Sequence, residues 1–329
     1  MIKVLVWVAA SLAVILALGA VTTWLIARRV EARFPPTGRF VNVAGGRVHV
    51  LEAGASNAAR PAIVLLHGAS SNAADLMHAL GHALAREHRV IALDRPGHGW
   101  SDRIAGRRAA EPAHQAAIVA EALRALGVEK AVVVAHSLAG AVAPHLARDH
   151  GDVAGGLVLL SPVTHPWPGG AIGWYYGPAT SRIGRLFTRT LTTPAAALVM
   201  RTAARAVFAP QAAPADYLEA ARIPLVLRPS AFEANAEDVA GLYAAVTAQN
   251  HRYRDIRVPS AIVSGNADTI VWTDIHSRGF AREVEGTKLV ILSGVGHMPH
   301  YAAPDLVVAE IEAVAARVEH ARELRALTP

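Results

Sequence analysis

The chain has 329 residues, of which 53% are hydrophobic and 18% charged, and its formal net charge is +6. This length predicts one large or two modest domains with a sizeable core. The sequence contains no cysteine, which excludes disulfides, thiolate catalysis and cysteine-ligated zinc. Its basic residues are mostly scattered arginines without interleaved aromatic side chains, so nucleic acid is not an expected partner.

The first segment is a long apolar stretch, because residues 4–27 contain no charged side chain. A helix needs about 20 apolar residues to cross the hydrocarbon core of a bilayer. Trp7 and Trp24 stand near the two ends, where aromatic side chains favour the membrane interface. We therefore expect residues 1–30 to form a transmembrane anchor. The alternative is a cleaved signal peptide, whose apolar region would be shorter, with the small residues 17–20 marking the cut.

The orientation of this anchor stays open. Lys3 precedes the apolar stretch, and Arg28, Arg29 and Arg33 follow it. The positive-inside rule then favours a cytoplasmic location for the rest of the chain. An N-terminal anchor that exports its domain is nevertheless the more familiar arrangement. We expect a single-pass protein, in a bacterial inner membrane, with the side of the catalytic domain undecided.

The next part of the chain alternates between expected strands and helices. Residues 31–38 are rich in proline and glycine and predict a linker. Alternating valines predict a hairpin, and continuous apolar runs predict buried strands separated by helices. The expected hairpin strands are 39–43 and 47–53, and the expected buried strands are 62–66, 90–93, 131–134 and 158–160. Such alternation is typical of an α/β fold with a mostly parallel, doubly wound sheet.

This alternation stops after residue 161. Residues 162–255 contain no buried-strand run and predict a mostly helical segment, whereas strands return at 261–264 and 289–292. We interpret 39–161 and 256–329 as two parts of one core and 162–255 as a helical lid inserted between them. An independent helical domain is the weaker alternative, because the sheet resumes afterwards. An amphipathic helix from 304 to about 327 ends the chain.

A serine lies at the turn between the expected strand 131–134 and the helix that follows. Ser137 is flanked two residues away by Ala135 and Ala139, with Gly140 one position later. This arrangement is a variant of the G-x-S-x-G nucleophile elbow, in which a sharp turn exposes the serine hydroxyl above the sheet. The alternative is an ordinary buried strand and helix with a serine between them by chance.

A serine hydroxyl needs a base to activate it and an acid to orient that base. In open α/β sheets, functional side chains follow the carboxyl ends of the strands. Asp268 follows the strand 261–264, and His297 follows the last strand. The order Ser137, Asp268, His297 is typical of one class of triad enzymes. The rival base is His300, which lacks a preceding Gly-x-Gly turn, and the rival acid is Asp274, which lies further beyond its strand.

Together with His67-Gly68 and the loop 94–101, these motifs resemble, in order, those of α/β-hydrolase-fold serine hydrolases. The similar proteins are the capped subgroup that contains esterases, C–C bond hydrolases, epoxide hydrolases and haloalkane dehalogenases. The resemblance covers roughly residue 38 to the C-terminus. It implies an oxyanion hole made by the backbone N–H groups of Ala69 and Leu138. It also implies that His67 and the 94–101 turn shape the floor of the site.

The expected substrate pocket comprises His67, Gly68, Ser70, His136, Trp174 and Tyr175. The aromatic cluster at 174–176 either lines an apolar pocket beneath the lid or packs within the lid. We expect no cofactor and no metal. The histidines at 78 and 82 have helical spacing, but no third ligand accompanies them at a defined spacing.

The identity of the nucleophile separates the subgroups of the resembling family. Epoxide hydrolases and dehalogenases carry an aspartate where this chain has Ser137, and dehalogenases usually place a tryptophan where it has Leu138. We therefore expect a hydrolase for small to medium, apolar carboxylic esters that acts through a Ser-His-Asp triad and an acyl-enzyme. The alternatives are hydrolysis of a C–C bond in a diketone and, less favoured, a non-catalytic binding protein on the same fold. The oligomeric state stays open.

Overall fold

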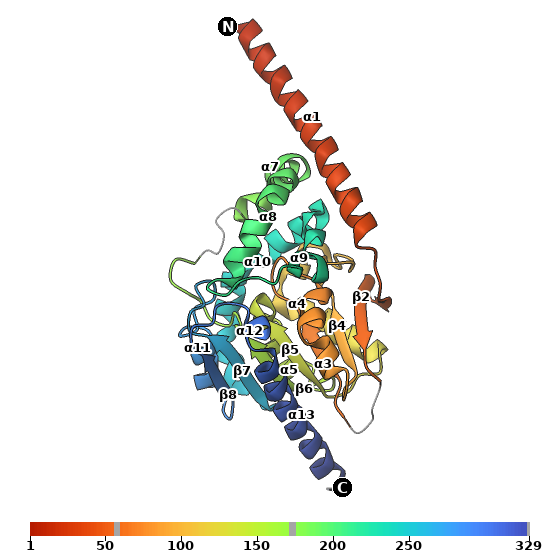
Figure 1. Ribbon diagram of the computed structural model, residues 1–329, viewed down its shortest axis with the longest axis vertical. Coiled ribbons are helices and arrows are strands. Elements are labelled where there is room, and N and C mark those ends of the chain that lie inside the picture. Colours follow the sequence, from red (N-terminus) through yellow and green to blue (C-terminus); the bar gives the residue numbers. More distant parts are fainter. Residues whose placement is uncertain (56–59, 171–175, 328–329) are drawn as a thin grey trace.

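The computed structural model describes residues 1–55, 60–170 and 176–327, with side chains described through residue 324. A long helix, α1 (Ile2–Arg33), extends away from a layered body. The last helix, α13 (Pro304–Leu327), lies at the opposite end of the molecule (Figure 1). The helix α1 ends three residues beyond the expected limit of the anchor, so the linker is shorter than the sequence pattern indicated.

An eight-stranded sheet forms the centre of the body, in the order β1-β2-β4-β3-β5-β6-β7-β8. The first two strands form the expected antiparallel hairpin, and β2 also pairs antiparallel with β4. All other neighbours are parallel, so the mostly parallel α/β sheet is confirmed. The strands are β1 (Arg39–Val43), β2 (Gly46–Ala53), β3 (Ile63–Leu66), β4 (Val90–Leu93), β5 (Ala131–His136), β6 (Ala154–Leu160), β7 (Ser260–Gly265) and β8 (Lys288–Leu292).

Helices cover both faces of the sheet, which explains why the central strands read as continuous apolar runs. On one face, side chains of the sheet pack with those of α4 (Pro112–Ala125), α5 (Ala143–Asp149) and α11 (Ser277–Glu283). On the other face, the core includes α13 and the short helical turns from α2 to α3. These turns are α2 (Ala73–Leu76), the π-helical η1 (Met77–Gly81) and α3 (His82–Leu84).

Between β6 and β7 the described residues, 161–170 and 176–259, form helices and loops and contribute no strand to the sheet. We call residues 162–255 the helical insertion. Its elements are α6 (Tyr176–Ala179), α7 (Arg182–Phe187), η4 (Thr188–Thr192), α8 (Thr193–Phe208), α9 (Tyr217–Ala220), η5 (Ile223–Leu227), α10 (Pro229–Gln249) and η6 (Asn250–Asp255). Trp174 and Tyr175, two of the expected pocket residues, lie outside the described residues.

The remaining short elements lie in the loops of the core. They are η2 (Gly106–Ala110), η3 (Ser137–Ala141) and α12 (Pro299–Ala302). The helix expected directly after Ser137 therefore begins as the 3₁₀ turn η3 and continues as α5.

In the described part of the chain, α1 is the one helix with the length and composition to cross a membrane. Its most apolar 18-residue window has a mean hydropathy of 2.6, and none of that window is buried inside the body.

Candidate active site

Ser137 occupies a strained turn at the end of the central strand β5. Its φ angle is 53°, in the left-handed region that non-glycine residues rarely adopt. Close packing surrounds this turn, because a Cβ atom at Gly68 would lie 2.9 Å from that of Ser137. A Cβ atom at Gly140 would lie 2.4 Å from Pro162. The glycine needed for close approach is thus Gly140, one position after the usual place in the motif.

The loops after β7 and β8 bring an imidazole and a carboxylate to this serine. His297 Nε2 lies 2.9 Å from Ser137 Oγ, and His297 Nδ1 lies 2.8 Å from Asp268 Oδ2. All three side chains are buried. The structure therefore joins the three residues singled out from the sequence in one hydrogen-bonded chain, although Ser137 lies 160 residues from His297 along the polymer.

The second carboxylate oxygen of Asp268 accepts hydrogen bonds from the backbone N–H groups of Ile270 and Val271, at 2.8 and 2.9 Å. Burial by itself raises the pKa of Asp268, but the hydrogen bond and charge of His297, with these two amides, outweigh it. The pKa of Asp268 consequently lies below its ordinary value. An ionised Asp268 accepts a hydrogen bond from His297 Nδ1–H, which leaves Nε2 free to accept from Ser137.

Neither rival residue joins this chain of hydrogen bonds. Asp274 is exposed and pairs with Arg278 one helical turn away, at 2.8 Å. His300 is fully buried, and its ring meets that of His136 edge to face, with the centroids 4.6 Å apart. Both ring nitrogens of His300 lack a hydrogen-bond partner in the described part of the protein.

His136 and His300 form a buried imidazole pair behind the base. His136 Nε2–H donates to the carbonyl of His297 at 3.1 Å, so its Nδ1 is the unprotonated nitrogen. Burial, with a contribution from His297, lowers the pKa of His136 to about 3. Burial, and then its two histidine neighbours, places the pKa of His300 well below its ordinary value. Both rings are therefore neutral at pH 7 and support the site as packing groups.

We expect His300→Leu to make the protein less sensitive to acid. In the unfolded chain a histidine takes up a proton below about pH 6.5, whereas folded His300 does not until a much lower pH. Unfolding of the wild type therefore becomes more favourable as the pH falls below about 6.5. Without His300 this contribution disappears, so the melting temperature should fall less between pH 8 and pH 5.5, measured by circular dichroism.

The matched control is His251→Leu, because His251 is exposed on η6. This variant is expected to keep the wild-type pH dependence. Equal acid sensitivity of H300L and the wild type would show that the buried imidazole does not carry the effect.

The loop after β3 contributes the expected oxyanion donor Ala69. Among the described residues, no protein acceptor takes the N–H of Ala69. The preceding residues fix the loop: the N–H of Arg95 donates to His67 Nε2 at 3.0 Å, and His67 Nδ1–H donates to the carbonyl of Gly68 at 2.8 Å. His67 is fully buried, so its side chain supports the loop from below rather than facing a substrate.

Sequence reasoning missed a second support of this loop, the fully buried Arg95. Its guanidinium donates to the carbonyls of His67 and Gly68, at 2.9 and 3.0 Å. The same guanidinium pairs with Asp238 of α10 at 2.6 Å, with neither side chain exposed. Asp238 also accepts from Gln115 and Arg103, at 3.1 and 2.8 Å. A buried ion pair thus ties the helical insertion to the loop that carries Ala69.

Two amide side chains of the insertion hold the catalytic loops in the same way. Asn235 of α10 accepts from the N–H of Ser70 at 2.6 Å and donates to its hydroxyl at 3.1 Å. Gln211 accepts from the N–H of Gly296 at 2.9 Å and donates to the carbonyl of Gly294 at 2.8 Å, on either side of Val295 and next to His297. Ser70 therefore has a structural role, because its hydroxyl oxygen accepts a hydrogen bond from Asn235 of the insertion.

Replacing Asn235 by leucine is expected to lower kcat about 10- to 100-fold while changing KM little. Asn235 is fully buried and touches Ser70, one residue from the Ala69 amide. A displacement of about 1 Å in such a positioned group is enough for a loss of this size. The measurement is steady-state hydrolysis of a chromogenic ester. Thr247→Val, an exposed site on the same helix, is expected to leave both parameters unchanged. A rise in KM with unchanged kcat would instead point to a role of Asn235 in ground-state binding.

Apolar side chains of the insertion and the core surround the elbow. Leu138, Val163, Val239, Leu242 and Val271 form one buried cluster, together with Ala141 and Val246. Ala69 and Trp167 pack against it. The backbone at Leu138 and Ala69 therefore lies in apolar surroundings, where hydrogen bonds to a developing charge are stronger than in water.

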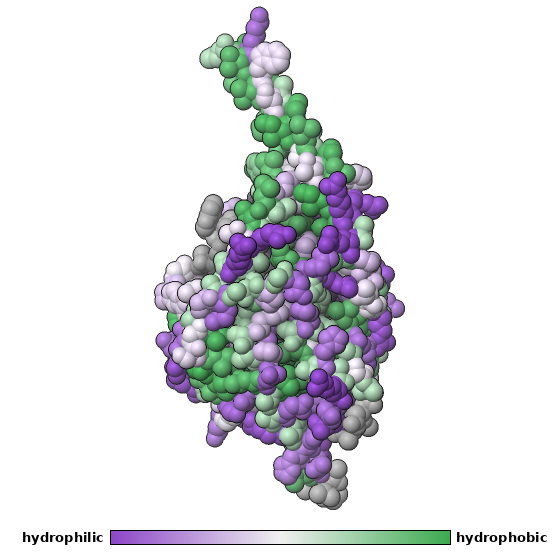
Figure 2. Space-filling model, viewed as in Figure 1, coloured by the Kyte–Doolittle hydropathy of each residue, from purple (hydrophilic) through white to green (hydrophobic). Residues whose placement is uncertain are grey.

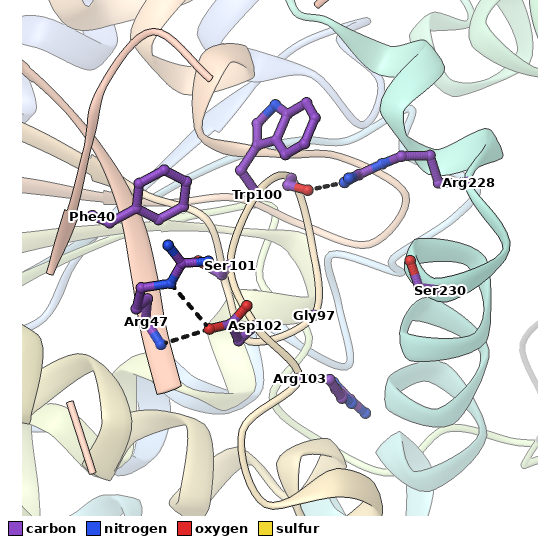
Figure 3. A pocket seen from close by; sticks show the side chains of 10 residues that line it. Phe40, Arg47, Gly97, Trp100, Ser101, Asp102, Arg103, Arg228 and Ser230 are labelled. Carbon is purple, nitrogen blue, oxygen red and sulfur yellow. Dashed lines mark hydrogen bonds and ion pairs between the residues drawn. The ribbon is translucent and has the colours of Figure 1, made fainter. Parts of the chain in front are cut away.

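A separate hollow of about 310 Å³ lies between the first hairpin, the loop 97–103 and the start of α10 (Figure 3). Arg47 lies over the ring of Phe40, and Arg228 lies over that of Trp100, 4.5 Å from its centroid. None of the residues that line this hollow belongs to the Ser137 hydrogen-bond chain. The hollow is therefore not where the serine would meet a substrate.

Within residues 1–55, 60–170 and 176–327, no group of three or more potential ligands is placed to hold a metal.

An eight-stranded, mostly parallel sheet with a serine on a strained elbow defines the α/β-hydrolase class of folds. The sequence profile of the alpha/beta hydrolase family matches residues 63–310. The chain belongs to this family.

The relatives of similar sequence have different activities. A dihydrolipoyllysine-residue acetyltransferase component of the acetoin cleaving system from Cupriavidus necator is 35% identical over 126 residues, 38% of this chain and 32% of that protein. Epoxide hydrolase B from Mycobacterium tuberculosis is 30% identical over 123 residues, 37% of this chain and 35% of that protein. The chain thus matches about a third of the length of these curated relatives.

Among solved structures, the enol-lactonase from Burkholderia xenovorans LB400 superimposes with a TM-score of 0.67 at 21% identity. The superposition covers 84% of this chain and 99% of the enol-lactonase. At this level of identity the likeness shows the fold alone.

Proposed function

We propose that the protein is a membrane-anchored serine hydrolase that cleaves carboxylic esters of small to medium, apolar acyl groups. The observation that carries the proposal is the continuous hydrogen-bond chain from Ser137 Oγ through His297 to Asp268. Two further features support it: the N–H of Ala69, which no acceptor takes in the described part of the chain, and the apolar cluster around Leu138. Serine at the elbow favours acyl transfer over epoxide opening, despite the match to an epoxide hydrolase.

In the proposed mechanism, Ser137 Oγ attacks the ester carbonyl carbon while His297 Nε2 takes its proton. The carbonyl oxygen becomes an oxyanion that accepts hydrogen bonds from the amides of Ala69 and Leu138. Collapse of this intermediate breaks the ester C–O bond, and the departing alcohol receives the proton from His297. Water, deprotonated by His297, then attacks the acyl carbonyl carbon. The bond from this carbon to Ser137 Oγ breaks, Ser137 Oγ regains the proton from His297, and the acid is released. Asp268 stays ionised throughout and stabilises the imidazolium.

We further propose that α1 is an uncleaved anchor and that the helical insertion is the lid of the site. Contacts between α1 and the body support an anchor over a signal peptide. Thr23 Oγ1–H donates to the carbonyl of Thr190 at 3.0 Å and is buried. Arg33 forms a two-pronged ion pair with Glu219, at 2.9 and 3.0 Å. Thr23 and Arg33 follow the small residues 17–20, whereas Gly19 lies among them and approaches Thr190 so closely that a Cβ atom would lie 2.6 Å from the Thr190 carbonyl oxygen. The fit to the body therefore begins within the segment where a signal peptide would be cut.

Cleavage of a C–C bond in a diketone is the weaker candidate, because it needs cationic side chains free to grip a substrate carboxylate. Four of the arginines in or near the insertion are engaged elsewhere, and Arg182, Arg201 and Arg205 are exposed to solvent rather than buried in the cluster around Leu138. The four pairs are Arg185 with Glu237, Arg189 with Glu233, Arg222 with the carbonyl of Pro35, and Arg228 with the carbonyl of Gly99.

The test compares turnover of p-nitrophenyl esters of increasing acyl length with that of a ring-cleavage diketone, using the full chain in detergent. We expect ester hydrolysis, covalent labelling by a fluorophosphonate, and no diketone cleavage. Diketone cleavage without ester turnover would replace the proposed reaction by C–C hydrolysis. Absence of both turnover and labelling would leave a binding protein on a hydrolase fold.

A further inference from the structure

The end of the helical insertion nearest to α1 exposes a group of large apolar side chains. Leu198 is 87% exposed and Ile183 is 71% exposed. We call the five residues of this group the apolar tip: Ile183, Leu186, Phe187, Leu198 and Val199. These residues lie on α7 and α8, which η4 joins into one helical stretch from residue 182 to 208. Exposed apolar residues are ordinary when they are scattered, but several of them along one stretch indicate a contact surface. In Figure 2 the hydrophobic colour of α1 continues onto the adjoining part of the body.

The helix α1 packs directly against the segment that carries the apolar tip. A Cβ atom at Gly19 would lie 2.6 Å from the carbonyl oxygen of Thr190, so only glycine permits this approach. Further along, Val30 and Phe34 of the N-terminal segment are buried in a cluster with Leu225 and Leu227 of the insertion. Trp100 Nε1–H donates to the carbonyl of Phe34 at 3.1 Å. The anchor is therefore attached to the insertion along half of its length rather than through a flexible linker.

The length of the free part of α1 fixes the height of the apolar tip relative to a membrane. The segment before Gly19, residues 2–18, is about 26 Å long at 1.5 Å per residue. The hydrocarbon core of a bilayer is about 30 Å thick. A membrane-spanning α1 consequently needs part of its contact with Thr190 at or inside the boundary of the hydrocarbon. The residues of the apolar tip lie within nine positions of Thr190 along the same helical stretch, about 14 Å at 1.5 Å per residue, which places them next to this boundary.

Positively charged side chains near the apolar tip are placed to contact the headgroup layer of a bilayer. Arg182 adjoins Ile183, and Arg201 and Arg205 follow Leu198 along α8; all three are exposed. Arg28 and Arg29 are exposed on α1 directly after the charge-free stretch. An apolar face bordered by guanidinium groups is the pattern of an interfacial helix on anionic phospholipid.

We propose that the apolar tip is inserted into the headgroup and acyl boundary of the bilayer that α1 crosses. This inference rests on the proposed anchor and assigns the substrate class of the hydrolase, namely esters dissolved in the membrane. The occupant of the surface is a phospholipid leaflet that contains anionic headgroups. The insertion thereby lies between the lipid phase and the elbow that carries Ser137.

The test uses the full chain in vesicles of phosphatidylcholine and phosphatidylglycerol, with and without doxyl-labelled lipid. Because the natural sequence has no cysteine, a fluorophore can be attached at Leu198→Cys or Ile183→Cys alone. We expect a loss of roughly half of the emission for both, as for a probe about 5–10 Å into the boundary. His320→Cys, exposed on α13 at the far end of the molecule, is the matched control and should lose no emission.

Leu12→Cys, on the free part of α1, separates the failure of this inference from that of the anchor. Quenching at Leu12 with none at Leu198 or Ile183 would overturn the insertion of the apolar tip and keep the anchor. No quenching at any of the three would overturn both. In another outcome, the fluorophore at Leu198→Cys escapes quenching while the unlabelled variant forms a disulfide between two chains on oxidation. That pair of results would show a second copy of the protein on this surface and would also overturn the inference. None of these readouts depends on hydrolase activity.

Discussion

Ser137→Ala is expected to lower ester turnover between about 10⁴- and 10⁶-fold, the range typical of a lost triad nucleophile. Its hydroxyl is the only group of the triad that forms a bond to the substrate in the proposed mechanism. The fold should persist, because alanine and serine share the same strain at a φ of 53°. The measurements are p-nitrophenyl ester hydrolysis and fluorophosphonate labelling, with circular dichroism to verify folding.

Ser161→Ala is the matched control for this loss. Ser161 is also buried, lies at the end of the neighbouring strand β6, and has a φ of 41°. Because it is not part of the hydrogen-bond chain, its removal should change turnover by no more than a few-fold. Comparable losses in the two variants would mean that any disturbance of this strained edge abolishes activity, and the role of Ser137 as nucleophile would be refuted.

The second large effect is expected for Asp238→Asn, a loss of about 3–5 kcal/mol in the free energy of unfolding. Asparagine keeps the shape of the side chain but leaves the fully buried guanidinium of Arg95 without its counter-charge. The ion pair itself contributes little net stability, whereas an unpaired buried charge is costly. Thermal and denaturant unfolding of the detergent-solubilised full chain measure this loss, and kcat should also fall because Arg95 holds the loop of Ala69.

Asp152→Asn provides the comparison on the surface. Asp152 pairs with Arg124 at 2.5 Å, but the side chains are 55% and 47% exposed. Solvent screens such a pair, so its loss should cost no more than about 1 kcal/mol. If D238N proves as stable as D152N, then Arg95 is not held by electrostatic compensation, and the proposed link between insertion and core loses its energetic basis.

Local patterns were sufficient for the parts of the fold that depend on short stretches of sequence. Runs such as Ile63–Leu66 and Val90–Leu93 are apolar because helices cover both faces of a parallel strand, and this environment is visible in the residues themselves. The three residues of the hydrogen-bond chain were also recognisable, because each follows the carboxyl end of a strand. Their catalytic role remains a prediction until the variants are tested.

Contacts between segments that are distant along the chain could not be predicted in this way from the sequence. Asn235, Asp238 and Gln211 each reach a loop that is far away in sequence, and nothing in the surrounding residues indicates which partner an amide or carboxylate will meet. Arg95 is buried only because Asp238 compensates it, a condition that appears only after folding. The small residues Gly19 and Thr23, one helical turn apart on the anchor, were the one available hint that a face of α1 is packed.

The close fit of Gly19 and Thr23 against Thr190 also limits where this enzyme can work. A domain on a loose tether can swing and sample substrate on an opposing membrane or in free micelles. In the proposed arrangement, a domain locked to a spanning α1 cannot turn over, so the elbow that carries Ser137 stays at one height and one tilt relative to the bilayer. Hydrolysis should then be confined to the leaflet in which each molecule resides. Vesicles that lack the protein would keep their esters even when mixed with vesicles that carry it.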